Sequence, residues 1–515
     1  MSIHPFSNEK SNDWKKGERN AELQQAFASI REQFSTTYPL YINGEEIYTG
    51  NKVPSYNPSN HEQVLGYVSQ AGKHEVEKAI DSAEKAFEEW RLQSFKDRAM
   101  YLLKAAEMMR KRKAELVAWQ IYEAGKNYNE ADGEILEAID FLEMYARKAI
   151  ALGEEQSVNT LPGIENRFEY LPLGVGVIIP PWNFPLAILT GMTASAIVTG
   201  NTVLIKPSTV TPVTGYKFME IMQEINLPNG VVNFVPGSSR EIGDFMVGHK
   251  DVNFISFTGS KEVGLRIDEI AHQRIKGQRW MKRVISEMGG KNAVVVDETA
   301  DLDAAAEAIV TSAFGFQGQK CSAGSRAIIH ERVYDALVAK IVERSETLKV
   351  GNTLENPDLG PVIDEKAYNN IVDYIEVGKE EASLALGGTS DNRTGYYIEP
   401  TIFKDVSPEA RIMKEEIFGP VLAICKVSNF EEGIRVYNNT EYGLTGALFT
   451  KDRKRMDYAR KHMRCGNLFF NGKSTGAIVG VQPFGGYYMS GTGAKTGTGE
   501  YLLNFVQAKV TSEKL

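Results

Sequence analysis

Residues 202–206 read Thr202-Val203-Leu204-Ile205-Lys206, a short apolar run that stops at a lysine. Three similar runs flank it, at 176–179, 231–235 and 254–257. The segments that separate and follow these runs, 186–198, 213–225, 240–247 and 260–272, have the apolar spacing of helices. Short strands that alternate with helices predict a parallel sheet of the α/β class. Such sheets bind ligands at the carboxyl ends of their strands.

A second set of the same kind begins at 292–296. It continues through a helix at 303–315, a strand at 327–329 and a helix at 333–348, and it resumes from about 398 to 471. Ahead of the first set, helical spacing covers 20–34 and 73–152, and two short strands meet at an Asn43-Gly44 turn. The tail at 501–511 alternates as a strand does. We therefore predict an α/β fold with two doubly wound parallel-sheet domains and a small β element.

The composition is that of an ordinary soluble globular protein, since 42% of the 515 residues are hydrophobic and 24% are charged. A net charge of −9 argues against nucleic acid or an anionic membrane as a partner. Three cysteines, Cys321, Cys425 and Cys465, are few and odd in number, which indicates a reducing compartment without disulfides. The N-terminus is polar and no uncharged apolar run of 18 residues occurs. We therefore expect a cytoplasmic protein without a signal peptide or membrane span.

One cysteine lies in Gly318-Gln319-Lys320-Cys321-Ser322, among glycines and small polar residues where a ligand can approach the backbone. An ionised cysteine is the strongest side-chain nucleophile near neutral pH, and we expect the charge of Lys320 to favour the ionisation of Cys321. A cysteine is more often a small buried hydrophobic residue than a nucleophile. The functional interpretation of this stretch therefore depends on the rest of the chain.

Two other stretches carry side chains suited to acyl chemistry. Asn183, between Trp182 and Phe184, could donate its amide to an oxyanion, although an Asn beside a proline is usually a turn residue. Glu287 is followed by Met and two glycines and could move as a general base. The alternative for Glu287 is a surface carboxylate.

Two strand ends of the first set offer groups for a phosphate or a ribose. Lys206 ends one strand, where the alternative is a solvated loop charge. Gly259 and Ser260 end another strand and open a helix whose N-terminal amides can hold a phosphate; the alternative is that Ser260 only caps the helix. The dinucleotide fingerprint itself is missing, because Ile179 stands where the run from Gly174 would need its third glycine.

Together these stretches resemble those of the aldehyde dehydrogenase superfamily over nearly the whole chain. The matching stretches, in the family's order, are Pro181-Trp182-Asn183-Phe184-Pro185, Lys206-Pro207-Ser208, Phe257-Thr258-Gly259-Ser260, Glu287-Met288-Gly289-Gly290-Lys291, Gly318-Gln319-Lys320-Cys321 and Glu416-Ile417-Phe418-Gly419-Pro420. The resemblance implies that the Cys321 thiolate attacks an aldehyde, and that Asn183 and the Cys321 N–H hold the oxyanion. It implies that Glu287 then activates water to release the acid.

The resemblance also implies NAD as cofactor. Lys206 and Glu416 would hold the two riboses, Ser260 the pyrophosphate, and Phe418 would pack near the nicotinamide ribose. The full set of cofactor contacts that we expect is Trp182, Lys206, Ser208, Thr209, Gly259, Ser260, Glu416 and Phe418. Many NAD-preferring relatives carry an acidic residue where Thr209 stands. A neutral residue does not repel a 2′-phosphate, so we expect NADP to be tolerated.

Within the family the chain resembles most the members that oxidise L-glutamate γ-semialdehyde in proline or arginine catabolism, on the stretches 137–141, 280–284, 321–322 and 475–480. This resemblance implies substrate contacts at Glu137, Phe184, Ser322, Gly476, Ala477 and Phe484. Glu137 would face the ammonium, and Ser322 with the amides of 476–477 the α-carboxylate. The chain departs from the pattern at Gly472-Lys473 and at 498–500. Another carboxylated aldehyde, such as succinate semialdehyde, is therefore the alternative substrate.

The pattern of strands and helices sets the domain boundaries, since the chain shows no internal repeat and no low-complexity linker. We assign 1–150 and 167–286 to a Rossmann-like cofactor-binding domain, 287–486 to a catalytic domain, and 151–166 with 487–515 to an oligomerisation element of a homo-oligomer. We expect no metal, because the seven histidines never pair at ligand spacing.

Two other classes of function are alternatives. A serine hydrolase is suggested by Gly472-Lys473-Ser474-Thr475-Gly476, but that motif needs a following helix and a later histidine, and none comes after His462. A catalytically silent structural member of the family is the non-enzyme alternative, and the intact reactive positions argue against it.

Overall fold

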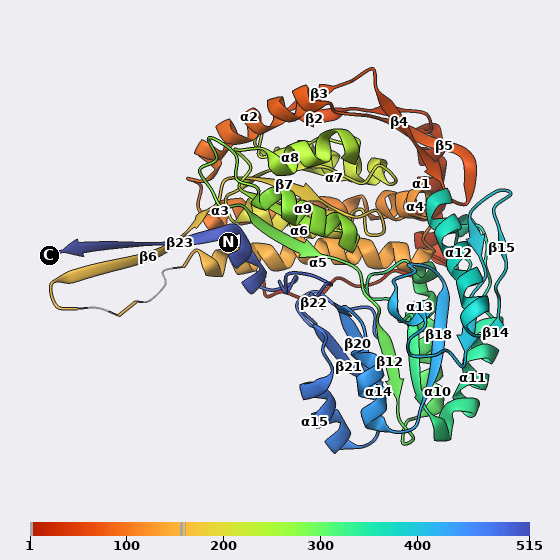
Figure 1. The fold of residues 1–515 in the computed structure, drawn as a ribbon. Coiled ribbons are helices and arrows are strands. Elements are labelled where there is room, and N and C mark those ends of the chain that lie inside the picture. Colours follow the sequence, from red (N-terminus) through yellow and green to blue (C-terminus); the bar gives the residue numbers. More distant parts are fainter. Residues whose placement is uncertain (1–3, 155–157, 160) are drawn as a thin grey trace.

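The computed structural model describes residues 4–154, 158–159 and 161–515. Two seven-stranded sheets lie one above the other, each with helices on its faces, and a two-stranded arm extends from one side (Figure 1). In spatial order, the strands of the first sheet are β11 (Arg283–Glu287), β10 (Phe254–Thr258), β7 (Val175–Ile179), β8 (Thr202–Ile205), β9 (Val232–Phe234), β2 (Leu40–Ile42) and β3 (Glu45–Ile47).

The first five of these strands are parallel, and β2 and β3 add an antiparallel edge. The chain runs outward from β7 through β8 to β9 and then returns to the other side of β7 at β10. The strand order therefore reverses between β7 and β10, which is where sheets of this type bind ligands.

Side chains of β8 alternate between two cores, because Val203 and Ile205 belong to one core cluster and Leu204 to another. The Leu204 face is covered by α2 (Lys73–Trp90), α8 (Asp244–Gly248) and α9 (Lys261–His272). The opposite face packs against α1 (Gly17–Glu32), α3 (Phe95–Lys111), α4 (Lys113–Ala124), α5 (Tyr128–Leu152), α6 (Ala187–Val198) and α7 (Pro212–Glu224). A three-stranded sheet of β1 (Thr37–Tyr38), β5 (Asn60–Ser69) and β4 (Lys52–Asn57) lies beside them.

The second sheet contains, in spatial order, β14 (Ser383–Leu386), β17 (Thr401–Lys404), β18 (Val421–Val427), β13 (Arg326–His330), β12 (Ala293–Val296), β20 (Thr445–Phe449) and β21 (Asn467–Phe470). All its pairs are parallel except β14 with β17. One face packs against α10 (Leu302–Phe314) and α11 (Tyr334–Glu346). The other packs against α12 (Glu365–Glu381), α13 (Arg411–Lys414), α14 (Phe430–Tyr437) and α15 (Arg453–His462).

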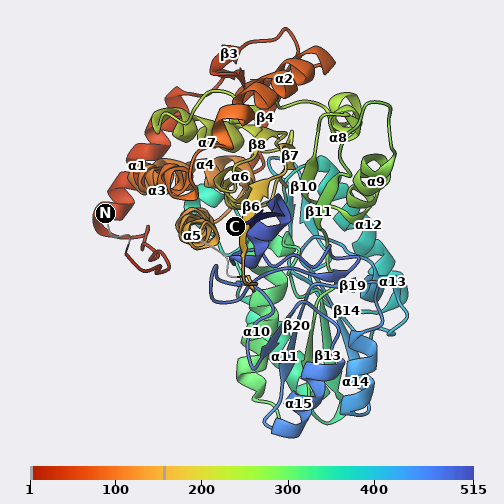
Figure 2. The same ribbon diagram turned by 90° about the vertical axis from the view of Figure 1, so that its left-hand side faces the viewer.

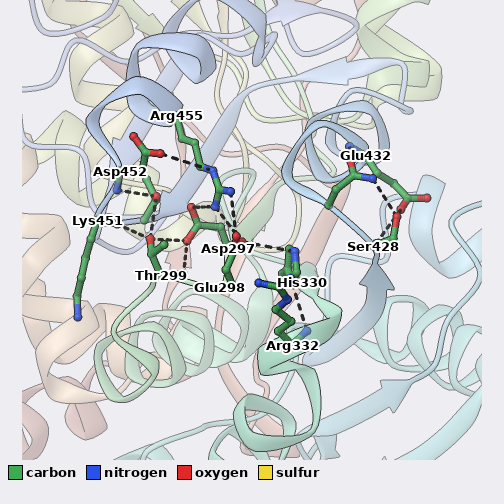
Figure 3. Close-up of polar contacts among 12 residues, drawn as sticks. Asp297, Glu298, Thr299, His330, Arg332, Ser428, Glu432, Lys451, Asp452 and Arg455 are labelled. Carbon is green, nitrogen blue, oxygen red and sulfur yellow. Dashed lines mark hydrogen bonds and ion pairs between the residues drawn. The ribbon is translucent and has the colours of Figure 1, made fainter.

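A charged network closes the carboxyl edge of the second sheet at its own reversal point, between β12 and β20 (Figure 3). Arg455, at the start of α15, donates to Asp297 (2.9 Å) and Glu298 (2.8 Å), which follow β12. Glu298 also faces Nε2 of His330, at the end of β13, at 3.5 Å. The charged groups of this network are thus paired with one another. Cys321 precedes β13 and therefore lies toward the opposite, amino-terminal edge of this sheet.

The arm consists of β6 (Ile164–Pro172) and β23 (Val506–Lys514), which pair antiparallel over nine residues. It projects away from both sheets in Figure 1, and Figure 2 looks along it. Two short pairs complete the strands: β15 (Ser390–Asp391) with β16 (Tyr397–Ile398), and β19 (Tyr442–Gly443) with β22 (Tyr487–Tyr488).

The predicted α/β class with two parallel sheets is confirmed. The predicted tail strand starts too early, because residues 500–505 form a 3-10 helix and the strand begins at Val506. Strand β6 crosses the limit that we placed between 166 and 167, and residues 155–157 and 160 of the predicted 151–166 segment lie outside the described residues. The domain limits stay a prediction. In the described part of the chain, no helix is long and apolar enough to cross a membrane.

Candidate active site

A cavity of about 510 Å³ lies where the carboxyl edge of the first sheet faces the loops before β13. Its walls come from α5, α6, the turn that carries Cys321 and the loop between β21 and β22. The structure brings together in this cavity all six residues that we assigned to the substrate, with Cys321 and Glu287; the six are Glu137, Phe184, Ser322, Gly476, Ala477 and Phe484.

A tight turn between α10 and β13 carries Cys321. Phe316, Gln317 and Gly318 all have left-handed backbone angles (φ 50°, 55° and 68°), which cost energy at the first two. The Gln317 side chain offsets part of that cost, since its Nε2 donates to two backbone oxygens of neighbouring loops (2.7 and 3.0 Å). Gly318 is required, because a Cβ there would stand 2.2 Å from the Gly419 carbonyl oxygen.

The surroundings of Cys321 favour the neutral thiol. Burial raises the pKa of Cys321 first, and three carboxylates raise it further, to about 12; these are Glu416, Glu287 and Glu137. Our expectation that Lys320 favours the thiolate is wrong. Lys320 Nζ pairs with Glu130 at 2.8 Å, so the charge of Lys320 is already compensated.

Asn183 lies beside the Cys321 turn. One N–H of its side-chain amide donates to the Gln319 carbonyl (2.9 Å), which leaves the second N–H for another acceptor. Helix α6 begins directly after this loop and has no capping side chain of its own. Glu134 of α5 takes that role, because its carboxylate accepts from the backbone N–H groups of residues 186 and 187 (2.8 and 3.1 Å).

A buried ion pair joins the Asn183 loop to the Cys321 turn. The second oxygen of Glu134 pairs with Lys126, and neither side chain is exposed. Lys126 Nζ also lies over the rings of Phe184 (4.2 Å) and Phe316 (4.7 Å). We did not predict this pair, since a lysine that follows a glycine-terminated helix looks like a solvated charge in the sequence.

Glu287 ends β11 and is 8% exposed. Its Oε2 accepts from the Gly486 N–H at 3.3 Å, and Oε1 has no hydrogen-bond partner among the described residues. Burial raises the pKa of Glu287 well above its ordinary value. The two glycines that follow allow close approach: a Cβ on Gly289 would stand 2.1 Å from the Glu416 carboxylate, and one on Gly290 2.6 Å from the Cys321 carbonyl oxygen.

Five of the predicted cofactor contacts lie at the carboxyl edge of the first sheet. Lys206, Ser208 and Thr209 follow β8, and Gly259 and Ser260 follow β10. Lys206 is 3% exposed, and burial lowers its pKa to about 8. The Ser260 hydroxyl caps α9 by accepting from a first-turn N–H (3.4 Å), as the alternative interpretation had it. Thr209 is exposed.

Three predicted contacts come from other loops at the same edge. Glu416, which lies between α13 and β18, accepts from the Gly290 N–H (2.8 Å), and burial raises its pKa to about 7. The Phe418 ring stands edge-on to Trp182, with 5.5 Å between the ring centroids.

Charged groups of both signs line the cavity. Glu137 is one, and burial followed by the nearby Glu134 carboxylate raises its pKa to about 7. Lys320 and Lys473 are the cations. Lys473, which we noted only as a departure from a pattern, reaches close to Gly476, since a Cβ on that glycine would stand 3.0 Å from Nζ. Such a cavity suits a ligand that carries both an ammonium and a carboxylate.

Several cavity residues were not predicted. Among them, Asn8 and Glu9 line the cavity from the N-terminal segment, which shows no motif in the sequence. Ser474 of the hydrolase motif lies in the loop after β21 and donates to the Ser322 carbonyl (3.4 Å). Among the described residues, no group of three or more His, Cys, Asp or Glu side chains could hold a metal ion.

Comparison with known proteins gives four close similarities. The profile of the "Aldehyde dehydrogenase family" matches residues 47–511. The 1-pyrroline-5-carboxylate dehydrogenase of Oceanobacillus iheyensis is 51% identical over 513 residues, which covers 99% of this chain and 100% of the relative. The 1-pyrroline-5-carboxylate dehydrogenase 2 of Bacillus subtilis is 51% identical over 511 residues, 99% of each chain. The structure of 1-pyrroline-5-carboxylate dehydrogenase from Thermus with bound NAD superposes with a TM-score of 0.99, 47% identity and full coverage of both chains.

Proposed function

Because the chain belongs to the aldehyde dehydrogenase family, we propose that it oxidises L-glutamate γ-semialdehyde, the open form of 1-pyrroline-5-carboxylate, to L-glutamate with NAD. The observation that carries the proposal is the cavity, in which one cysteine thiol stands among charged groups of both signs. The identity to 1-pyrroline-5-carboxylate dehydrogenases over nearly the whole chain supports it.

The reaction starts at Cys321. Its thiol gives its proton to solvent water, the sulfur then attacks the aldehyde carbon as the thiolate, and the carbonyl oxygen becomes an oxyanion. The Asn183 amide and the Cys321 backbone N–H are the donors that we assign to it. After the substrate carbon has been oxidised, the acyl group is held on Cys321 as a thioester.

Glu287 completes the cycle. Its raised pKa makes the carboxylate a better base than an exposed glutamate, and it takes a proton from water. The resulting hydroxide attacks the thioester carbon, the C–S bond breaks, and L-glutamate leaves with Cys321 again as thiolate.

The residues at the carboxyl edge of the first sheet fit NAD. Lys206 presents a buried ammonium there, and the exposed amides at the start of α9, next to Gly259 and Ser260, suit a phosphate. Glu416 offers a carboxylate for ribose hydroxyls, and Trp182 with Phe418 forms an aromatic wall. When bound, NAD accepts the hydride that leaves the substrate carbon.

The charges in the cavity select the substrate. Glu137 binds the ammonium, and Ser322 with the amides of Gly476 and Ala477 binds the α-carboxylate. Phe184 and Phe484 flank the aliphatic part. Buried polar groups that lose their partners penalise the wrong ligand, by up to several orders of magnitude in kcat/KM. We also propose that the first sheet is the cofactor-binding unit, that the second carries the catalytic loop, and that the β6–β23 arm joins copies of the chain.

The test is a panel of aldehydes with NAD, read as absorbance of the reduced nicotinamide. Glutamate semialdehyde should have the highest kcat/KM, succinate semialdehyde a lower one, and propanal the lowest. Cys321→Ala should abolish turnover and retain NAD binding, because Lys206 and Glu416 are untouched. Equal efficiency on propanal would rule out the assigned substrate, and turnover by Cys321→Ala would rule out the thioester route.

A further inference from the structure

The first described residues form a strap along α5 (Figure 1). We call residues 4–14 the N-terminal strap. Three side chains of α5 hold it, those of Asp132, Asp140 and Arg147. Trp14 Nε1 donates to Asp132 (2.7 Å), the Glu9 N–H donates to Asp140 (2.8 Å), and Arg147 donates to the carbonyl of residue 4 (2.8 Å). The three positions are spaced by about two helical turns, so the strap follows one side of the helix.

Within the strap, Asn8 connects two walls of the cavity that it lines. Its Nδ2 donates to Asp140 Oδ2 on α5 (2.8 Å) and to the Val479 carbonyl in the loop after β21 (2.9 Å). Phe6 adds a second contact to the same loop, because a Cβ on Gly480 would stand 3.1 Å from its ring and 2.3 Å from Met144 of α5.

The loop at 476–480 is held by core packing at Val479, which belongs to the same cluster as residues of α5, and by such contacts. It contains no helix or strand, and Gly476 and Gly480 both have left-handed backbone angles (φ 78° and 77°). Its bond from the Ile478 N–H to the Gln482 side chain is local and does not fix the loop relative to α5. The Asn8 amide bridges the loop and α5, because it donates hydrogen bonds to both.

We propose that the N-terminal strap is a specificity-determining part of the substrate site, with Asn8 as a positioning residue. Asp140 lies one helical turn after Glu137, and Val479 lies two residues after Ala477. Asn8 therefore sets the distance between the carboxylate that binds the ammonium and the amides that bind the α-carboxylate. This inference rests on the proposed function, which assigns those two roles. An uncharged aldehyde such as propanal has neither an ammonium nor a carboxylate, so its binding does not depend on that distance.

The experiment compares Asn8→Ala with Asn12→Ala in the full chain. Asn12 is a matched control, because it lies on the same strap but reaches Asp132 through its backbone N–H (3.1 Å) and not through its side chain. Loss of two hydrogen bonds, one to a carboxylate, should raise KM for glutamate semialdehyde by about tenfold in Asn8→Ala. We expect kcat, the dissociation constant of NAD and kcat/KM for propanal to stay at wild-type values, and Asn12→Ala to match wild type throughout.

Phe6→Leu keeps both hydrogen bonds of Asn8 and removes only part of the ring contact to the loop. It should therefore raise KM for glutamate semialdehyde by less than Asn8→Ala does. This variant also tests the strap if Asn8→Ala does not fold. A merely structural role would lower the melting temperature or the fraction of active enzyme without changing the ratio of the two aldehydes' KM values. If wild type prefers glutamate semialdehyde and the strap variants keep its KM, the inference is overturned alone. If wild type shows no preference, the proposed function and the inference fall together.

Discussion

At the scale of single residues, the chemistry depends on the charge around Cys321. Burial and then three carboxylates raise the pKa of its thiol to about 12, and the neighbouring Lys320 is paired with Glu130. A substrate ammonium beside Glu137 would remove part of that negative potential. We therefore predict that substrate binding helps to ionise the nucleophile, and that an amino-acid aldehyde does so better than a simple one.

Glu137→Gln tests this coupling. Removing one negative charge lowers the pKa of Cys321, so the free variant should react faster than wild type with iodoacetamide at pH 8, measured by mass spectrometry. KM for glutamate semialdehyde should rise, because the ammonium loses its partner. The pKa of Glu137 is raised to about 7, which predicts a pH dependence of KM. Wild-type KM should fall as the pH rises through 7, because the carboxylate ionises and can then bind the ammonium. KM of the variant should not change with pH in this range. Slower alkylation of the variant would contradict the coupling.

Glu287→Gln separates the two halves of the reaction. In the proposed reaction, Glu287 acts on water after the substrate carbon has been oxidised, so the variant should still give a rapid burst of reduced nicotinamide in stopped flow. Its steady-state rate should fall by about 10²- to 10⁴-fold, the usual contribution of a general base. Absence of the burst would mean that Glu287 acts earlier, at the Cys321 thiol.

Thr209→Glu tests the choice of cofactor. The exposed Thr209 follows β8, which ends at Ile205, and a carboxylate there would repel a 2′-phosphate. The repulsion is worth on the order of 1 kcal/mol, so the variant should weaken NADP about tenfold more than NAD, measured by fluorescence titration. Thr209→Gln, which has a similar size and no charge, is the control. Equal weakening of both cofactors, or no turnover of wild type with NADP, would disprove the electrostatic argument.

At the scale of elements, the two sheets use their edges differently. The first leaves its reversal point free for a ligand, whereas Arg455 closes that of the second by bridging Asp297 and Glu298 (Figure 3). The Arg455 guanidinium lowers the pKa of Glu298 to about 2. Helix α15 is thereby attached to the ends of β12 and β13, and the network has a structural role.

Arg455→Met should destabilise the fold by about 2 kcal/mol, the usual value for hydrogen bonds between charged groups. Because the folded pKa of Glu298 is depressed, its stabilisation is present above about pH 4.5 and is lost as the pH falls toward 2. Urea unfolding should show that pH dependence in wild type and a flatter curve in the variant. Lys454→Met, at an exposed neighbouring position, should change neither, and kcat of both variants should match wild type.

The elements also show what the sequence predicts and what it does not. Most strands of the two sheets follow from short β-branched runs between helical patterns. Strand β11 was not predicted, because charged residues stand at both of its ends. Contacts between distant segments carry no local signal. The cap that Glu134 supplies to α6, the Glu130 partner that compensates Lys320, and the Asn8 bridge each join positions more than 50 residues apart. The roles assigned to the site residues stay predictions that the variants above test.

At the scale of the whole molecule, the active site is formed between two units that each fold around their own sheet. The first sheet contributes Glu287 from its last strand, the second contributes the turn with Cys321, and α5 closes the cavity from the side. Each of the two units supplies a part that the other lacks. Contacts between the two units, such as the hydrogen bond from the Asn183 amide to the Gln319 carbonyl, hold these parts in their relative position.

Contacts within one chain do not explain how the β6–β23 arm is stabilised. An isolated two-stranded sheet is marginally stable in water, and its unpaired edges attract other chains. Yet β6 and β23 pair over nine residues, with Val506 the one buried residue of β23 and Val510 59% exposed. We expect the arm to pack against a second copy of the chain.

Thr511→Pro, in the middle of β23, removes a backbone donor and should break the ladder. Light scattering after size exclusion should then give a mass above that of one chain for wild type and for the control Ser512→Ala, and a lower mass for Thr511→Pro. A wild type that elutes as a single chain would mean that the arm is stable alone.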